Sequence, residues 1–167
     1  MKNILEMEFL NAVNQNIAII HKVCNIYFKN PADRQDVFQE ILYQLWKSYK
    51  SFTGASKFST WMYRVAFNTA IGHVKSINKE APKEEINEYH LQTVENNDTQ
   101  ERNENITLLY KAVHTLSDID KAITLLYLED KSYEEMAAIT GLTKTNISVR
   151  LVRIRKQLKE KMNVLIN

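Results

Sequence analysis

The stretch Ser132–Lys156 constrains this chain most, because it carries the signals for two short helices joined by a tight turn. Ser132 and Glu135 stand at the spacing of a capping box, which predicts a helix that begins directly after the serine. Gly141 can adopt the left-handed conformation that ends a helix, and Thr143 can cap the next one. The pattern therefore predicts a helix-turn-helix.

The second of these helices is predicted to have one buried face and one basic face. Its apolar stripe consists of Ile147, Leu151, Ile154 and Leu158. The small side chain of Ala137 on the first helix would allow the two helices to cross closely. Cationic, amide and hydroxyl groups near the start of an exposed helix suit base edges and phosphates in a DNA major groove. The residues expected to bind DNA are Thr143, Lys144, Thr145, Asn146, Val149, Arg150, Arg153 and Lys156. A solvated helix of an ordinary bundle is the alternative.

Composition favours an all-α fold. The 167 residues include three glycines and two prolines, helix formers dominate, and few runs alternate as strands do. Cys24 is the single cysteine, which excludes an intramolecular disulfide and fits a reducing compartment. No signal peptide is visible, and no run reaches the roughly 20 apolar residues of a membrane span. We expect a cytoplasmic protein without membrane insertion.

Charge is segregated along the chain, although the formal net charge is +2. Residues 1–75 carry a net charge of +4, residues 76–104 carry −5 and residues 105–167 carry +3. The acidic, polar segment 77–105 has little hydrophobic periodicity and is typical of a flexible linker. The prediction is two small helical domains joined by this linker: an N-terminal domain over residues 1–76 and a C-terminal helix-turn-helix domain over residues 106–167.

Hydrophobic periodicity and capping signals predict the individual helices. In the N-terminal domain we expect helices over about 8–28, 31–49 and 59–76. In the C-terminal domain a helical pattern resumes at Ile106, and Ser117 is expected to cap a further helix before the helix-turn-helix.

Two helices of the N-terminal domain carry candidate binding surfaces. The outer side of the second helix gathers Asp36, Gln39, Glu40 and Tyr43. From spacing alone, this patch is either a solvated face or a docking surface. One stripe of the third helix mixes aromatic, cationic and amide groups, which suit unstacked bases: Trp61, Arg64, Asn68, Ile71 and Lys75. The alternative is that Trp61 belongs to the core and the cations are ordinary surface charges.

Nothing in the sequence indicates catalysis. There is no nucleophile–base pattern, phosphate-binding glycine loop or metal-ligand cluster. His21 and Cys24 are spaced like a pair of metal ligands, but nothing nearby completes a site. His73, His90 and His114 are expected at the surface. We expect neither enzymatic activity nor a cofactor.

Taken in order, the segments over about 17–76 and 108–159 resemble the bacterial RNA polymerase sigma factors of the extracytoplasmic-function type, the smallest sigma factors. The resemblance implies two helical domains and a linker. It also implies binding to core RNA polymerase and to promoter DNA. Whether an anti-sigma factor binds the chain stays open.

Three segments carry the resemblance. Asp36-Val-Phe-Gln-Glu40 resembles the signature on the helix that docks to the clamp of the polymerase largest subunit. Phe58–Asn68 resembles the segment that binds the non-template strand of the minus-ten element and helps open it. Tyr133–Ala137 with Arg150–Arg153 resembles the helix-turn-helix that reads the minus-thirty-five element as duplex.

Three positions depart from the family pattern. Phe67 stands where a basic residue is common, Gly72 where an acid is common, and Val149 where a small polar residue is common. These departures concern promoter preference more than the class of protein. The alternative class is a DNA-binding regulator whose N-terminal helices sense a signal or dimerise. Such a sensor has no need of both the polar patch that begins at Asp36 and the mixed aromatic and cationic stripe that begins at Trp61.

Overall fold

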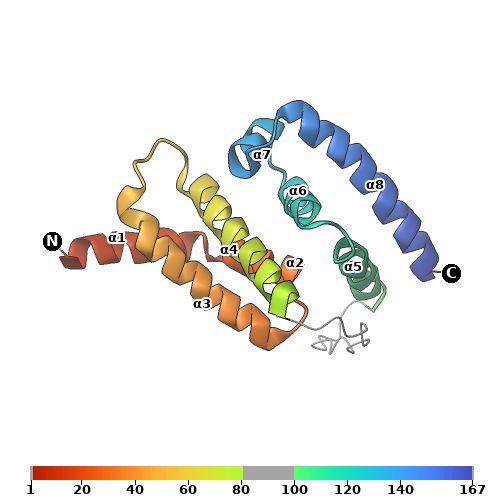
Figure 1. Ribbon diagram of the computed structural model, residues 1–167, viewed down its shortest axis with the longest axis horizontal. Helices are drawn as coiled ribbons and strands as arrows, with labels where there is room; N and C mark the ends of the chain where they lie inside the picture. Colours follow the sequence, from red (N-terminus) through yellow and green to blue (C-terminus); the bar gives the residue numbers. More distant parts are fainter. Residues whose placement is uncertain (1, 81–99, 167) are drawn as a thin grey trace.

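The computed structural model describes residues 2–80 and 100–166. All regular secondary structure in those ranges is helical, which confirms the predicted all-α class (Figure 1). The N-terminal half consists of α1 (Lys2–Gln15), α2 (Ile17–Tyr27), α3 (Pro31–Ser48), the short 3-10 helix η1 (Tyr49–Ser51) and α4 (Phe58–Glu80). The C-terminal half consists of α5 (Gln100–Val113), α6 (Asp118–Leu128), α7 (Tyr133–Thr140) and α8 (Lys144–Ile166). None of the described helices combines the length and apolar character needed to cross a membrane.

The single helix predicted over residues 8–28 is wrong, because the chain forms two helices that meet at Asn16. The backbone of Asn16 leaves the helical region, with φ −119° and ψ 14°. Its N–H bonds to the carbonyl of Val13 at 3.0 Å, and its side-chain amide donates to the carbonyl of Ala12 at 2.9 Å. Asparagine bonds of this kind compete with the regular helical ladder. The N-terminal end of α1 projects beyond the other helices of this half, whereas Phe9 and Val13 of the same helix are buried in the core (Figure 1).

The boundaries around the predicted linker also differ from expectation. α4 continues to Glu80 rather than ending near Ser76, since no glycine or proline lies between them to stop it. α5 begins at Gln100 rather than near residue 106, and its first turn contains the good helix formers glutamine, glutamate and arginine. Both ends of the segment 77–105 are therefore helical. The remainder of the predicted linker, residues 81–99, lies outside the described residues.

Buried side chains of both halves form one continuous hydrophobic core. α3 contributes the fully buried residues Val37, Ile41 and Leu45, which recur every four residues along its inner face. The largest other fully buried side chains come from α2, α4, α6, α7 and α8: Ile20, Met62, Ile123, Leu126, Met136, Ile147 and Ile154.

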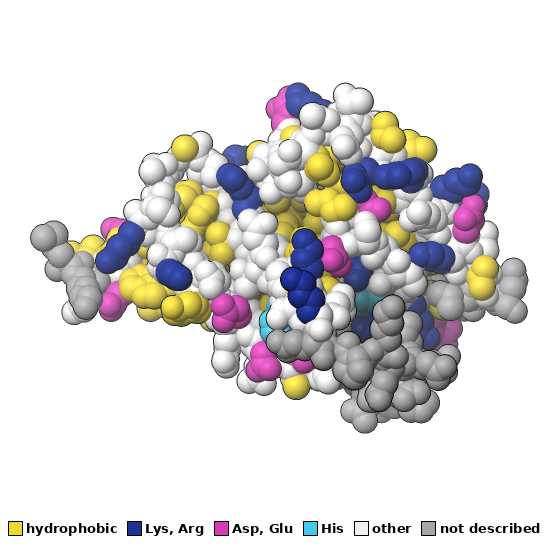
Figure 2. Space-filling model, in the orientation of Figure 1, with side chains coloured by type: hydrophobic (Ala, Val, Ile, Leu, Met, Phe, Trp, Pro, Cys, Tyr) yellow, Lys and Arg dark blue, Asp and Glu magenta, His cyan; other side chains and the backbone are white. Residues whose placement is uncertain are grey.

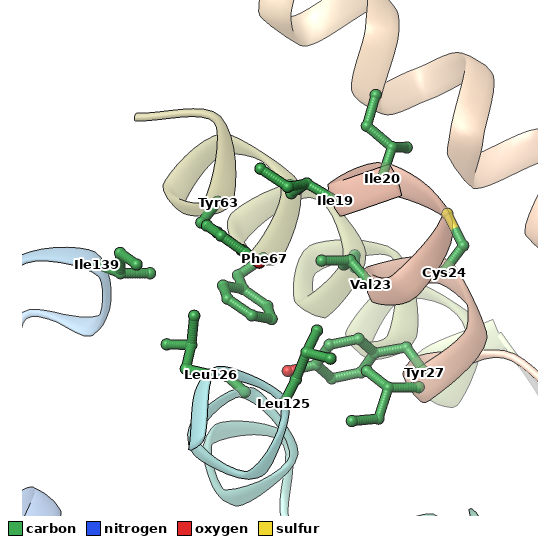
Figure 3. Close-up of a cluster of buried hydrophobic side chains, with 14 of the residues drawn as sticks. Ile19, Ile20, Val23, Cys24, Tyr27, Tyr63, Phe67, Leu125, Leu126 and Ile139 are labelled. Carbon is green, nitrogen blue, oxygen red and sulfur yellow. The ribbon is translucent and has the colours of Figure 1, made fainter. Parts of the chain in front are cut away.

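The two halves touch where α2 and α4 pack against α6 and α7. The Tyr27 hydroxyl donates to the carbonyl oxygen of Asp118 at 2.6 Å, and the Lys22 ammonium pairs with the Glu129 carboxylate at 2.7 Å. Burial, and to a smaller extent the nearby charge of Asp118, raises the pKa of Tyr27, so this hydroxyl remains a donor. Between these polar contacts, Phe67 lies beside Leu126 in an apolar cluster (Figure 3).

Two of the three histidines expected at the surface are partly buried. The pKa of His114 is lowered to about 4, chiefly by burial and to a smaller extent by the charges of Lys121, Lys29 and Arg34. The ring of His73 meets Phe28 edge-on, with centroids 5.6 Å apart. The third, His90, lies outside the described residues.

We predict that Phe67→Lys separates the two halves without unfolding either. An ammonium group beside Tyr27 and Leu126 loses its hydration unless it leaves the apolar cluster. Small-angle X-ray scattering should then give a larger radius of gyration, while circular dichroism should retain the helical signal. Phe67→Leu keeps an apolar side chain and should scatter like the parent chain. Unchanged scattering of the lysine variant would contradict the interface.

Stability should fall as the pH drops from about 6.5 to about 4. The pKa of His114 is lowered from 6.5 to about 4 in the folded chain, so over this window the unfolded chain binds a proton that the folded chain does not. Below about pH 4 both states carry the proton and this contribution stops changing. Urea unfolding at several pH values should show a smaller acid-dependent loss in His114→Gln than in the parent chain. Equal losses in the two proteins would contradict the burial of this imidazole.

Candidate nucleic-acid interface

The helix-turn-helix forms with the predicted caps. The Ser132 hydroxyl accepts the Glu135 N–H at 3.1 Å, and the Thr143 hydroxyl accepts the Asn146 N–H at 3.1 Å. Gly141 has φ +76°, the left-handed conformation, and its N–H donates to the carbonyl of Ala137 at 2.9 Å. Each end of the turn is thus fixed by a hydrogen bond, which confirms the predicted start of α7 and the turn before α8.

One face of α8 is buried and the other is open. Ile147, Leu151 and Ile154 are buried as predicted, and Leu158 is partly buried. In Figure 2, Lys and Arg side chains gather over α8. The predicted DNA-binding residues that lie exposed are Thr143, Lys144, Thr145, Asn146, Val149, Arg153 and Lys156. A shallow surface hollow is lined by Thr143, Thr145, Asn146, Val149, Arg150 and Arg153.

Arg150 differs from the other residues on this face because it is bound within the protein. Its Nη1 donates to Asp120 Oδ1 of α6 at 3.0 Å, and its Nε donates to Asn146 Oδ1 at 2.8 Å. The side chains of Arg150 and Asp120 are 25% and 14% exposed. Arg150 therefore ties α8 to α6. Arg153, in contrast, has no ion-pair partner among the described residues and faces solvent.

The predicted stripe of α4 is only partly available to a ligand. Arg64, Asn68 and Lys75 are exposed, whereas Ile71 is partly buried. Trp61 is also partly buried, and its ring lies 5.0 Å from that of Phe52, measured between centroids. The rings of Phe58 and Tyr49 also lie against Trp61. The tryptophan thus belongs in part to the core, as the alternative interpretation of the stripe held.

The predicted patch on α3 lies on the solvent side of that helix. Asp36, Gln39, Glu40 and Tyr43 are all exposed. Because the buried residues of α3 lie on the opposite face, these four side chains contribute little to packing. Glu40 accepts a hydrogen bond from the Gln44 amide at 2.9 Å, within the same helix.

Residues capable of binding a metal do not cluster within the described parts of the chain, where no three His, Cys, Asp or Glu side chains come together. Cys24 is buried, and burial raises the pKa of its thiol to about 11. This thiol is therefore protonated and poorly reactive at neutral pH.

Comparison with known proteins matches each half of the chain to a region of one protein family. A family model for Sigma-70 region 2 matches residues 12–80, and one for Sigma-70, region 4 matches residues 106–158. The ECF RNA polymerase sigma-E factor of Haemophilus influenzae is 31% identical over 145 residues, which cover 80% of this chain and 77% of that protein. The chain belongs to the sigma-70 family. The sigma-E factor of Escherichia coli K12 is 29% identical over 159 residues, which cover 87% of the present chain and 83% of the E. coli protein.

Two solved structures share the fold of this sigma factor. Sigma factor RpoE of Bartonella quintana, in complex with the anti-sigma factor NepR, gives a TM-score of 0.68 at 20% identity, covering 98% of this chain and 99% of that one. CnrH in complex with the cytosolic domain of CnrY gives a TM-score of 0.69 at 14% identity, and the match covers 95% of this chain and 90% of CnrH. The matches to regions 2 and 4, together with the similarity to ECF sigma-E factors, make the chain an ECF-type factor for promoter-specific initiation by RNA polymerase.

Sequence analysis missed two features of the sigma factor's α8 surface. Asp120 was not recognised as the partner of Arg150, since the two residues are 30 positions apart. Val152, which is 66% exposed, was left out of the DNA-binding set. Its position could have been found from periodicity, because it lies one turn after Val149 and off the buried stripe.

We predict that alanine substitutions separate the two arginines of this sigma factor. Arg150→Ala leaves the largely buried Asp120 carboxylate without its cation and should lower the free energy of unfolding by about 1–3 kcal/mol. Arg153→Ala should change stability by no more than about 0.5 kcal/mol. The same change should weaken binding to the upstream duplex by about 1–3 kcal/mol if the guanidinium contacts a base edge.

Urea unfolding and duplex titration over a range of salt concentrations measure the two effects. Lys159→Ala, which removes an exposed cation elsewhere on α8, is the matched control for charge. Equal stability of Arg150→Ala and the parent chain would contradict the structural role of Arg150.

Proposed function

We propose that this sigma factor uses three separate helical surfaces, one for core RNA polymerase and two for promoter DNA. The supporting observation is that each surface includes several exposed side chains and lies on a helix matched by a sigma-70 family model. The domain division into residues 1–76 and 106–167, with 77–105 as tether, is part of this proposal.

The α3 surface is the proposed docking site for polymerase: Asp36, Gln39, Glu40 and Tyr43. These residues lie at spacings of three, one and three, so they share one side of the helix. Two carboxylates, an amide and a phenol offer charge, hydrogen bonds and apolar area to a partner. The rigid helix needs no rearrangement before it binds, which keeps the entropic cost of docking small.

The α4 surface is the proposed site for the non-template strand of the minus-ten element. Arg64 and Lys75 would follow the phosphates and Asn68 would meet a base edge. Ile71 lies between them. Trp61 is held by its aromatic neighbours, so its accessible part would present a fixed surface on which a base can stack.

The α8 surface is the proposed reader of the minus-thirty-five element as duplex. Its N-terminal residues Thr143, Lys144, Thr145 and Asn146 project from the capped end of the helix, where backbone N–H groups also favour phosphate. Arg153 and Lys156 extend the cationic side. Arg150 would act chiefly by positioning α8 through Asp120 and by orienting Asn146.

The partners and compartment follow from the same proposal. A chain that recruits polymerase to promoters works in the bacterial cytoplasm, and it contributes binding energy rather than catalytic groups. We also propose an anti-sigma factor as a regulatory partner, because the two similar solved structures are complexes of sigma factors with such proteins or domains.

Reversing charge on α3 tests the docking site. Asp36→Lys with Glu40→Lys should abolish co-purification with core polymerase, since both carboxylates would become repulsive cations. Circular dichroism should remain native because exposed charges contribute no more than about 1 kcal/mol each. The control is Glu8→Lys with Glu160→Lys, an equal charge change at exposed positions of α1 and α8.

Asn68→Ala separates docking from promoter opening within the same experiment. It should leave co-purification intact and reduce permanganate reactivity of the melted minus-ten region. If the α3 double variant still bound polymerase and opened promoters normally, the docking assignment would be wrong.

A further inference from the structure

Two valines form an apolar pair on the otherwise polar face of α8. Val149 is 57% exposed and Val152 is 66% exposed. Residues three apart on a helix are neighbours, so the two side chains lie side by side. Asn146 and Arg153 flank the pair at spacings of three and four residues from Val149. The buried stripe of α8 lies on another side of the helix and does not include either valine.

Packing and helix formation within the described residues do not account for this pair. Valine is less favourable in a helix than lysine, glutamine or arginine, because its branched Cβ restricts χ1. Exposed positions of α8 near the pair carry the polar residues expected of a solvated face, such as Thr145 and Lys156. Isolated exposed valines need no explanation, but these two are adjacent on the helix, and Val149 gives an apolar wall to the hollow that Asn146 and Arg153 also line.

The pair is held in a fixed position before any ligand binds. The Thr143 cap and the Arg150–Asp120 ion pair fix the start of α8 against α6. The β-branched side chains themselves have few rotamers to lose on contact. Three residues advance about 4.5 Å along a helix, which is close to the spacing of about 3.4 Å between base pairs. The two valines can therefore reach neighbouring base pairs.

We infer that Val149 and Val152 recognise thymine 5-methyl groups on neighbouring base pairs of the duplex bound by α8. The 5-methyl group of thymine is the apolar feature of the major groove, and apolar side chains contact it. Asn146 supports this arrangement: its carbonyl oxygen already accepts from Arg150, which leaves the NH₂ group to donate to a base or phosphate acceptor. The inference rests on the proposed function of α8 as a duplex reader. It adds a specificity for A·T pairs at the two neighbouring base pairs that Val149 and Val152 contact.

The test removes the methyl group from DNA and the valine from the protein. The full chain, assembled with core RNA polymerase, first selects its upstream duplex from a library randomised in that region. Each thymidine of the selected duplex is then replaced singly by deoxyuridine, which lacks only the 5-methyl group. At the contacted positions, affinity should fall about fourfold, the factor expected when one methyl-sized group is no longer buried.

Serine substitutions assign each methyl group to its valine. Each serine variant, Val149→Ser or Val152→Ser, should lose the preference for thymidine over deoxyuridine at the position that its own valine contacts. It should keep the fourfold preference at the position contacted by the remaining valine. Val164→Ser is the matched control, because Val164 lies near the end of α8 and is 76% exposed. This variant should retain both preferences, and all three should keep the parent circular dichroism.

The outcomes distinguish this inference from the function on which it rests. Selective duplex binding without a deoxyuridine effect at any position would overturn the methyl contacts and leave α8 as the reader. A deoxyuridine effect that persists in both serine variants would also overturn them, since another group must then contact the methyl. Failure of the assembled polymerase to select any upstream sequence would contradict the proposed function of α8 and the methyl contacts together.

Discussion

The steep crossing of α7 and α8 depends on the left-handed turn at Gly141. A residue with a Cβ atom at φ +76° is strained by roughly 1–2 kcal/mol even though no neighbouring atom blocks the space. The turn lets Met136 of α7 and Ile147 of α8 share one core while the other side of α8 faces outward. The exposure of the candidate DNA-binding residues is thus a consequence of how this short turn directs the second helix.

A charged contact supplements this apolar packing. Arg150 reaches from α8 to Asp120 on α6, and its second hydrogen bond holds the Asn146 side chain. A guanidinium suits this role because it donates in several fixed directions at once. The orientation of a polar group on the binding face therefore depends on a carboxylate on another helix. Arg150, which the sequence places among the DNA-binding residues, thus also fixes the geometry of that face.

Local signals predicted the local parts of the structure. The caps at Ser132, Thr143 and Ser117 each follow from residues within four positions of one another, and all three are formed. The exposed α3 patch follows from periodicity in the same way. The helix break at Asn16 was missed because the apolar pattern continues across it, and only the bonds from Asn16 to the carbonyls of Ala12 and Val13 mark the interruption of the ladder.

Contacts between distant residues were beyond the reach of the sequence. Tyr27 meets Asp118 from 91 positions away and Lys22 meets Glu129 from 107, and no periodicity encodes such pairs. The same holds for Phe67, whose departure from the family pattern was interpreted as a matter of promoter preference. Its burial beside Leu126 gives the aromatic ring a packing role between the halves.

This contact between the halves has a thermodynamic consequence for every ligand of the chain. A ligand that binds only when the halves are apart has an apparent affinity reduced by the fraction of molecules in which they are apart. A ligand that binds while the halves are joined incurs no such penalty, and its binding raises the population of molecules with joined halves. Two such ligands oppose one another even if they touch different residues, because each shifts the same equilibrium in the opposite direction. The strength of the contact that Phe67 makes between the halves therefore sets the free energy that any ligand of the separated halves must supply.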